Sequence, residues 1–222
     1  PLGGKAKLDV HLGRLPKRYW IYLGVTALFG IGNSSNAFLI LRTHAPGASL
    51  TLTILIYALF NLVAALASYP AGYLSDHFGR RNVLLVSFLI FLVVYAGFGL
   101  TTDSVLLGFL FASYGLYQGI FRAVGKALAS DLVPEELRAS GVGWYMTTVG
   151  LTGLVASIVG GVLWSNVGPA ATFLYGAGSA LPGSVALISL VPGSARPGGV
   201  IDVWITRSPA TEGLPGCARS GT

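Results

Sequence analysis

The sequence predicts an all-α membrane protein, built as a bundle of six transmembrane helices. Of its 222 residues, 53% are apolar and only 10% are charged, whereas a soluble domain carries about a quarter charged residues. Six apolar stretches are long enough to cross a hydrocarbon core about 30 Å thick, which needs roughly 20 helical residues. Lys and Arg residues gather on one side of the resulting topology, a positive-inside pattern.

The six stretches are predicted to be helices because unpaired backbone groups are too costly in lipid. They cover residues 19–41, 50–71, 83–100, 105–128, 142–164 and 170–191. The side that we expect to be cytoplasmic carries Lys5, Lys7, Arg14, Lys17, Arg18, Arg80, Arg81, Arg122, Lys126, Arg138, Arg196, Arg207 and Arg219, and only Arg42 lies on the other side. Both termini are therefore predicted to be cytoplasmic.

Three regions follow from this division. Residues 1–18 form a basic cytoplasmic segment, residues 19–191 the membrane domain, and residues 192–222 a Gly- and Pro-rich tail that we expect to be disordered. The net charge of +6 is spread over loops that flank the membrane, so we expect anionic lipid headgroups, and no nucleic acid, as its partners. A single cysteine, Cys217, excludes a disulfide framework.

The first stretch carries a polar cluster near its middle. Asn33 and Asn36 lie three residues apart, and therefore share one face of a helix. This cluster would either hold a substrate or allow the helix to bend.

The loop after the second stretch, "GYLSDHFGRR" (residues 72–81), concentrates charge between two apolar runs. Gly79 allows a tight reversal that a side chain would obstruct. Arg80 and Arg81 keep the loop out of lipid, and Asp76 is expected to pair with them or with the positive N-terminus of another helix. The alternative is a charged turn with no further role.

This loop, Gly72-x-Leu74-x-Asp76-x-x-Gly79-Arg80-Arg81, resembles the signature loop of the major facilitator superfamily of secondary transporters, except that His77 replaces a basic residue. The segments "FGIGNSSNAFLILR", "YGLYQGIFRAVGKALASDLVPEELRASGVGWY" and "TTVGLTGLVASIVGGVLW" resemble the last six helices of bacterial drug-efflux-type permeases. The resemblance covers residues 15–192. It implies one six-helix half of a twelve-helix fold in a bacterial inner membrane, with a conformational latch at Gly72, Asp76, Gly79, Arg80 and Arg81.

The fourth stretch carries a polar stripe at four-residue steps: Tyr114, Gln118, Arg122 and Lys126. Charged groups inside spans usually face a cavity or a partner. The alternatives are that Lys126 snorkels to the headgroups, that Gln118 bridges two helices, and that Arg122 pairs with a nearby acid (Asp131, Glu135 or Glu136). The resemblance would place Asn33, Asn36, Gln118 and Arg122 in a central cavity, to which Tyr114 of the same stripe is added. Arg122 there would favour an anionic substrate.

The fifth stretch carries small residues four apart, Gly153, Ser157 and Gly161, and the fourth carries Gly115 and Gly119. Such spacing gives a groove for close helix contact, either with a second bundle or within this one.

The predicted function is small-molecule transport by a half-size chain that acts by alternating access. Since the halves of such transporters are parallel repeats, two copies could form a homodimer, or another six-helix half could complete the fold. The alternative is a non-transporting membrane protein that binds or regulates a partner. Catalysis is not expected, because His11, His44 and His77 lie outside the spans. We also expect no metal and no cofactor.

Overall fold

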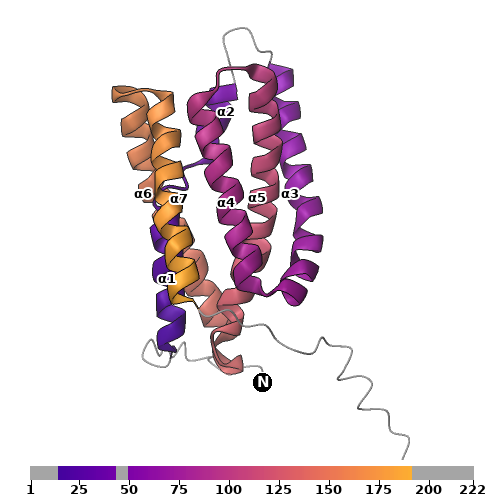
Figure 1. Cartoon of the computed structure of the whole chain (residues 1–222), viewed down its shortest axis with the longest axis vertical. Helices are drawn as coiled ribbons and strands as arrows, with labels where there is room; N and C mark the ends of the chain where they lie inside the picture. The colour runs from indigo at the N-terminus through magenta and orange to yellow at the C-terminus, as the bar shows by residue number, and fades with distance from the viewer. Residues whose placement is uncertain (1–14, 44–49, 192–222) are drawn as a thin grey trace, which may run out of the picture.

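The computed structural model describes residues 15–43 and 50–191, and every regular element in them is helical. The elements are α1 (Lys17–Gly30), α2 (Asn36–Thr43), α3 (Leu50–Phe78), α4 (Arg80–Leu100), α5 (Ser104–Asp131), the short 3₁₀ helix η2 (Glu135–Leu137), α6 (Arg138–Asn166) and α7 (Pro169–Leu190) (Figure 1). The all-α expectation is therefore confirmed for this part of the chain. Most of the predicted basic segment and all of the predicted tail lie outside the described residues.

Five helices of the described chain, α3 to α7, are long and apolar enough to cross a membrane. They match the last five predicted spans, although α3 and α6 extend further at the ends that carry charged residues. The first predicted span, residues 19–41, is not one helix. It is divided into α1, with 14 residues, and α2, with 8 residues, so the predicted count of six continuous spans is not confirmed.

The break between α1 and α2 has a local cause. The amide of Asn33 donates to the carbonyl of Gly30 at 3.0 Å, which tightens the end of α1, and the next residues leave the helix. Two serine hydroxyls then replace backbone partners. Ser157 Oγ accepts from the amide of Ser35 at 3.2 Å, and Ser35 Oγ accepts from the amide of Ala37 at 3.3 Å. A bent segment is tolerated in a membrane protein only where such partners exist.

The start of α1, the α3–α4 turn, the α5–α6 connection and the end of α7 all lie at one end of the bundle, and α2 lies at the other (Figure 1). The basic loops therefore gather at one end, as a positive-inside chain requires. That this end is cytoplasmic stays a prediction.

Aromatic rings fill the interior where α1, α4 and α5 meet. Phe29 stacks on Phe88 with ring centroids 3.8 Å apart, and it meets Phe91 edge-on at 4.9 Å. Phe91 in turn lies 5.0 Å from Tyr117. Offset and edge-on pairs of this kind add to the packing of each ring, and in a membrane such packing is what holds helices together. The cluster gives the bundle a solid interior next to the break.

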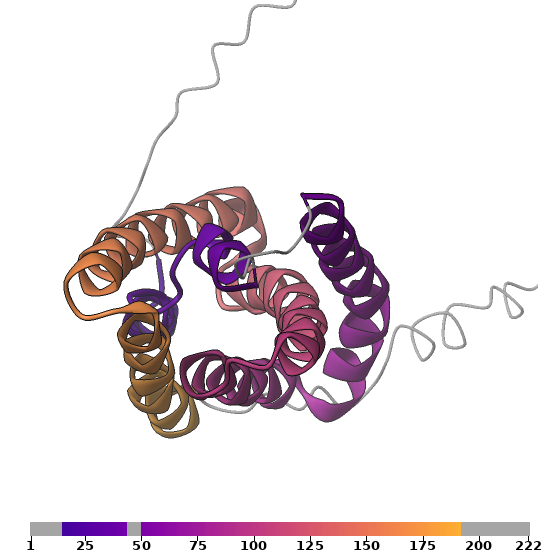
Figure 2. The same cartoon turned by 90° about the horizontal axis from the view of Figure 1, so that it is seen from above.

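Helices α3 and α6 are the outer helices of the bundle. Only 17% of the most apolar stretch of α3 and 11% of that of α6 are buried, against 50% in α4 and in α5. Seen from above, α3 and α6 stand on either side of α2 and α5 (Figure 2). Their exposed sides are therefore available to lipid or to a second bundle.

Candidate functional site

A cavity of about 590 Å³ lies where the α1–α2 break faces α5 and α6. Its lining comes from α5, α6 and the α1–α2 break, so the site lies between α5 and the outer helix α6. Its lining mixes amide, hydroxyl, cationic and apolar side chains. The lining residues are Asn33, Ser34, Ser35, Asn36, Tyr114, Gln118, Phe121, Arg122, Lys126, Tyr145, Met146, Val149, Gly150, Gly153, Leu154 and Ser157.

The structure brings the five predicted cavity residues, Asn33, Asn36, Tyr114, Gln118 and Arg122, to this one cavity. The Tyr114 hydroxyl lies 2.9 Å from Oδ1 of Asn36 and 3.4 Å from Oδ1 of Asn33. A hydroxyl has one proton to donate, so the shorter contact with Asn36 is the stronger bond. Tyr114 thereby ties the middle of α5 to the broken helix. The part of these residues in substrate binding stays a prediction.

Below Tyr114 on α5, the polar stripe continues without internal partners. Gln118 is only 7% exposed, and its amide makes no hydrogen bond to any described residue. Arg122 and Lys126 are exposed into the same cavity. The expected alternative, in which Arg122 pairs with a nearby acid, is not seen: Asp131 pairs with another arginine and Glu135 pairs with Arg138 at 3.2 Å.

The two sets of small residues have different surroundings. A Cβ atom at Gly115 would lie 2.6 Å from the carbonyl oxygen of Phe60, and one at Gly119 would meet the carbonyl of Ala64, so both glycines pack α5 against α3. On α6, a Cβ at Gly153 would meet nothing within 4 Å, and one at Gly161 only the ring of Phe38 at 3.8 Å. Ser157 lies in the cavity wall. Among the described residues, the small-residue face of α6 is therefore open at Gly153 and faces the cavity and α2 at Ser157 and Gly161.

The predicted loop at residues 72–81 is mostly helical: Gly72 and Asp76 lie in α3, Arg80 and Arg81 begin α4, and only Gly79 separates the two helices. Gly79 has φ of 85°, a conformation that glycine adopts without steric cost. The carbonyl of Gly72 accepts from the hydroxyl of Ser75 at 2.7 Å. Arg81 Nε is buried and has no hydrogen-bond partner among the described residues.

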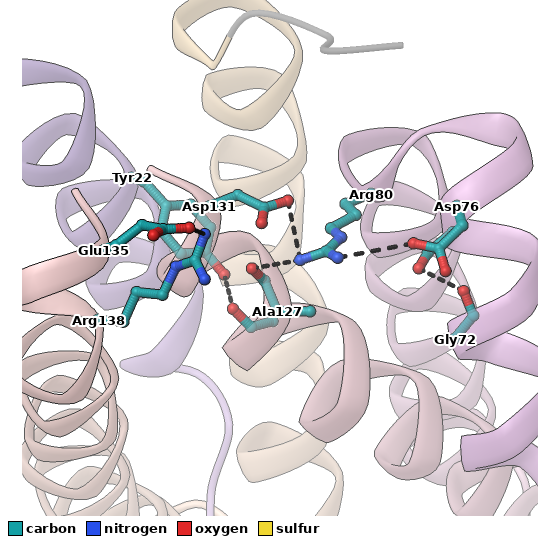
Figure 3. A network of polar contacts seen from close by, with 10 residues as sticks. Tyr22, Gly72, Asp76, Arg80, Ala127, Asp131, Glu135 and Arg138 are labelled. Atoms are coloured by element: carbon teal, nitrogen blue, oxygen red, sulfur yellow. Dashed lines mark hydrogen bonds and ion pairs between the residues drawn. The ribbon is translucent and has the colours of Figure 1, made fainter. Parts of the chain in front are cut away.

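Arg80 joins the α3–α4 turn to the end of α5 (Figure 3). Its guanidinium donates to a carboxylate oxygen of Asp131 at 2.8 Å and to the carbonyl of Ala127 at 2.6 Å. Asp76 lies further away, at 3.6 Å, and its side chain is 66% exposed, against 22% for Asp131. A cation at a helix C-terminus is also favoured by the helix dipole. Arg80 is therefore anchored on α5, and Asp76 is left mostly free.

Sequence reasoning missed the partner of Asp131 and part of the cavity wall. It suggested Asp131 as an ion-pair partner of Arg122, whereas Asp131 pairs with Arg80. It also left out Tyr145, which lines the cavity and stacks on Tyr22 with centroids 5.8 Å apart. Tyr145 lies eight residues before Gly153, so the four-residue spacing that selected Gly153 and Ser157 was the available signal. Within the described residues no group of three His, Cys, Asp or Glu side chains is placed to hold a metal ion.

Comparisons with known proteins agree on one family. The family model described as "Major Facilitator Superfamily" matches residues 21–209. The match runs past residue 192, where we expected the resemblance to end, so that expected limit was wrong.

Three curated relatives illustrate the similarity. An uncharacterized MFS-type transporter of Methanocaldococcus jannaschii is 36% identical over 182 residues, which cover 79% of this chain and 46% of the relative. The riboflavin transporter RfnT of Brucella anthropi is 34% identical over 49% of this chain and 27% of its own length. The tetracycline resistance protein, class B, of Escherichia coli is 32% identical over 54% of this chain and 29% of its own length. The chain thus spans about half the length of the first relative and less of the others.

The family match, the relatives and the five apolar helices identify a multi-pass membrane protein, for which the bacterial inner membrane is a fitting location. We conclude that the chain belongs to the Major Facilitator Superfamily.

Proposed function

We propose that this chain forms one half of a small-molecule transporter that works by alternating access, with a second six-helix bundle closing its cavity. The observation that carries the proposal is the polar cavity lined by α5, α6 and the α1–α2 break. Arg122 and Lys126 are exposed there, and the half-buried Asn33 and Asn36 line the same cavity. Exposure of such cations to lipid is costly, although Lys126, two residues before the end of the predicted span, can extend to the headgroups. A polar surface opposite the cavity would avoid the cost for Arg122.

A second copy of the chain is the partner that we favour. Two halves of such transporters are parallel repeats related by an axis along the membrane normal. Two identical chains with the same orientation can therefore associate around a two-fold axis, the commonest symmetry of homo-oligomers. The open small-residue face of α6 at Gly153, and the exposed side of α3, are the surfaces that would meet the partner. Another six-helix half would use the same surfaces.

The α3–α4 turn supports a two-state mechanism. Asp76 is exposed and is held only by Arg80 at 3.6 Å, while Arg80 keeps its closer contact with Asp131. Asp76 can therefore approach the positive N-terminus of a helix in the second bundle in one state and release it in the other. A contact that differs between two states is what shifts the equilibrium between them.

The substrate is expected to be a small organic molecule. Two relatives are named for transport of riboflavin and for resistance to tetracycline. A cavity of about 590 Å³ is within the range of ligand sites for molecules of that size.

The test is transport by the purified full chain in proteoliposomes, with riboflavin and tetracycline as the compounds assayed, together with subunit counting. Because Cys217 is the only cysteine, one dye per chain can be attached, and photobleaching in nanodiscs should show two steps. The replacement Asp76→Asn should slow transport without changing the number of steps. Single-step bleaching with no uptake of either compound would refute the proposal, and would favour a non-transporting membrane protein that binds a partner.

A further inference from the structure

The cavity is positively charged and carries no compensating acid. Arg122 and Lys126 lie one helical turn apart on α5, and both line it. No lining residue is an Asp or Glu. Ionised side chains within a membrane protein usually face a cavity or a partner and mark the path of a substrate or ion, and no acidic partner of these two cations lies in the described part of the chain.

The described carboxylates are engaged elsewhere or lie outside the cavity. Asp131 and Asp76 contact Arg80, and Glu135 contacts Arg138. Asp103 accepts the amides of Val105 and Leu106 at the start of α5. Glu136 is exposed in η2. The two cavity cations therefore have no acidic partner among the described residues and can attract an anion.

Two further features favour an anion at this site. The helix α2 begins at Asn36, a cavity residue, and the N-terminus of a helix carries a partial positive charge. Discontinuous membrane helices use such ends to receive anionic groups of substrates. The second feature is Gln118, whose side chain is only 7% exposed, lines the cavity and has no hydrogen-bond partner among the described residues. Its amide can therefore donate to, and accept from, a ligand in the cavity.

The remaining lining is apolar. Phe121, Met146, Val149 and Leu154 line the space beside the polar stripe. Gln118 lies one turn from Arg122, about 6 Å along the axis of α5. A ligand with an apolar body, an anionic group and a second hydrogen-bonding group would thus meet complementary side chains at each part.

We propose that this cavity binds a soluble organic anion, whose anionic group lies between Arg122 and Lys126 and whose body reaches Gln118. The proposal deepens the proposed function and rests on it for the route that the anion takes, although binding itself does not require transport. An anionic lipid headgroup presents the same chemistry, so the experiment must separate the two sources.

The experiment measures binding to the purified full chain in phosphatidylcholine nanodiscs at pH 7. The probes are 6-hydroxy-2-naphthoate and its neutral amide, which share a fluorescent ring and differ in charge, and empty nanodiscs give the background. We expect the naphthoate to bind at least about tenfold more tightly than the amide, since charge-assisted hydrogen bonds are the stronger ones. Arg122→Gln should remove about this tenfold preference, and Arg122→Lys should retain most of it. Arg18→Gln, which removes an exposed cation outside the cavity, should leave both affinities unchanged.

The outcomes separate charge from general binding and from transport. Gln118→Leu should weaken both probes equally. Equal affinity of the two probes, the absence of saturable binding, or an Arg122→Gln variant with the full preference would overturn the proposal. Loss of naphthoate binding when phosphatidylglycerol is added would assign the site to lipid and also overturn it. Tight naphthoate binding without transport would support the anion site while contradicting the proposed function.

Discussion

Replacing Gly119 by alanine tests how closely α3 and α5 pack. The added methyl group would meet the carbonyl oxygen of Ala64, and would also lie 3.1 Å from Cβ of Ala67 and 3.2 Å from the carbonyl carbon of Ala64. These atoms are the backbone of Ala64 and the Cβ of Ala67. Neither can move by rotation of a side chain, so no such rotation relieves the contact. The two helices must separate.

The magnitude follows from two opposing effects. Overpacking of a close helix contact costs about 1–3 kcal/mol. Alanine is a better helix former than glycine, which offsets up to about 1 kcal/mol of this loss of stability. We therefore expect Gly119→Ala to lower the free energy of unfolding by about 1–2 kcal/mol. Gly108→Ala is the matched control on the same helix, because its Cβ would meet nothing within 4 Å. It should be neutral or slightly stabilising.

The assay is reversible unfolding of each variant by sodium dodecyl sulfate in mixed micelles, followed by tryptophan fluorescence. Gly115→Ala should behave like Gly119→Ala, since its Cβ would lie 2.6 Å from the carbonyl of Phe60. If Gly119→Ala proves as stable as Gly108→Ala, then α3 and α5 do not approach as closely as the structure shows, and the reasoning fails.

Two other predictions concern the ion pairs at the charged end of the bundle and the orientation of the chain in the membrane. Asp131→Asn removes the 2.8 Å ion pair with Arg80 and should cost about 1 kcal/mol of unfolding free energy, whereas Asp76→Asn, at 3.6 Å and mostly exposed, should cost under about 0.5 kcal/mol; equal losses in the same unfolding assay would contradict this ranking. For orientation, the native cysteine is replaced and a cysteine is introduced at Thr102 or at Glu136. An impermeant maleimide should label position 102 in intact cells and position 136 only after permeabilisation, and the reverse pattern would invert the predicted topology.

Features that depend on local chemistry were predictable from the sequence. Hydropathy over about 20 residues predicted the five long helices, because the preference of a side chain for lipid does not depend on its neighbours in space. The reversal at Gly79 between α3 and α4 was also predictable, because glycine readily adopts the φ of 85° found there. Helical periodicity also placed Tyr114, Gln118 and Arg122 on one face, and the structure gives them one cavity.

Features that depend on partners distant in the chain were decided only by the tertiary structure. The polar cluster at Asn33 and Asn36 suggested that the first apolar stretch could bend, but the partner at the break, Ser157 of α6, which accepts from the amide of Ser35, is known only from the structure. Asp131 lies nine residues after Arg122 on α5, too far for a partner on the same helix, and it pairs with Arg80 of another helix. Composition and spacing thus determined that the chain is a helical membrane protein with a polar stripe. Which groups meet depends on how the helices pack, because contacts between helices are set by three-dimensional proximity that no local pattern encodes.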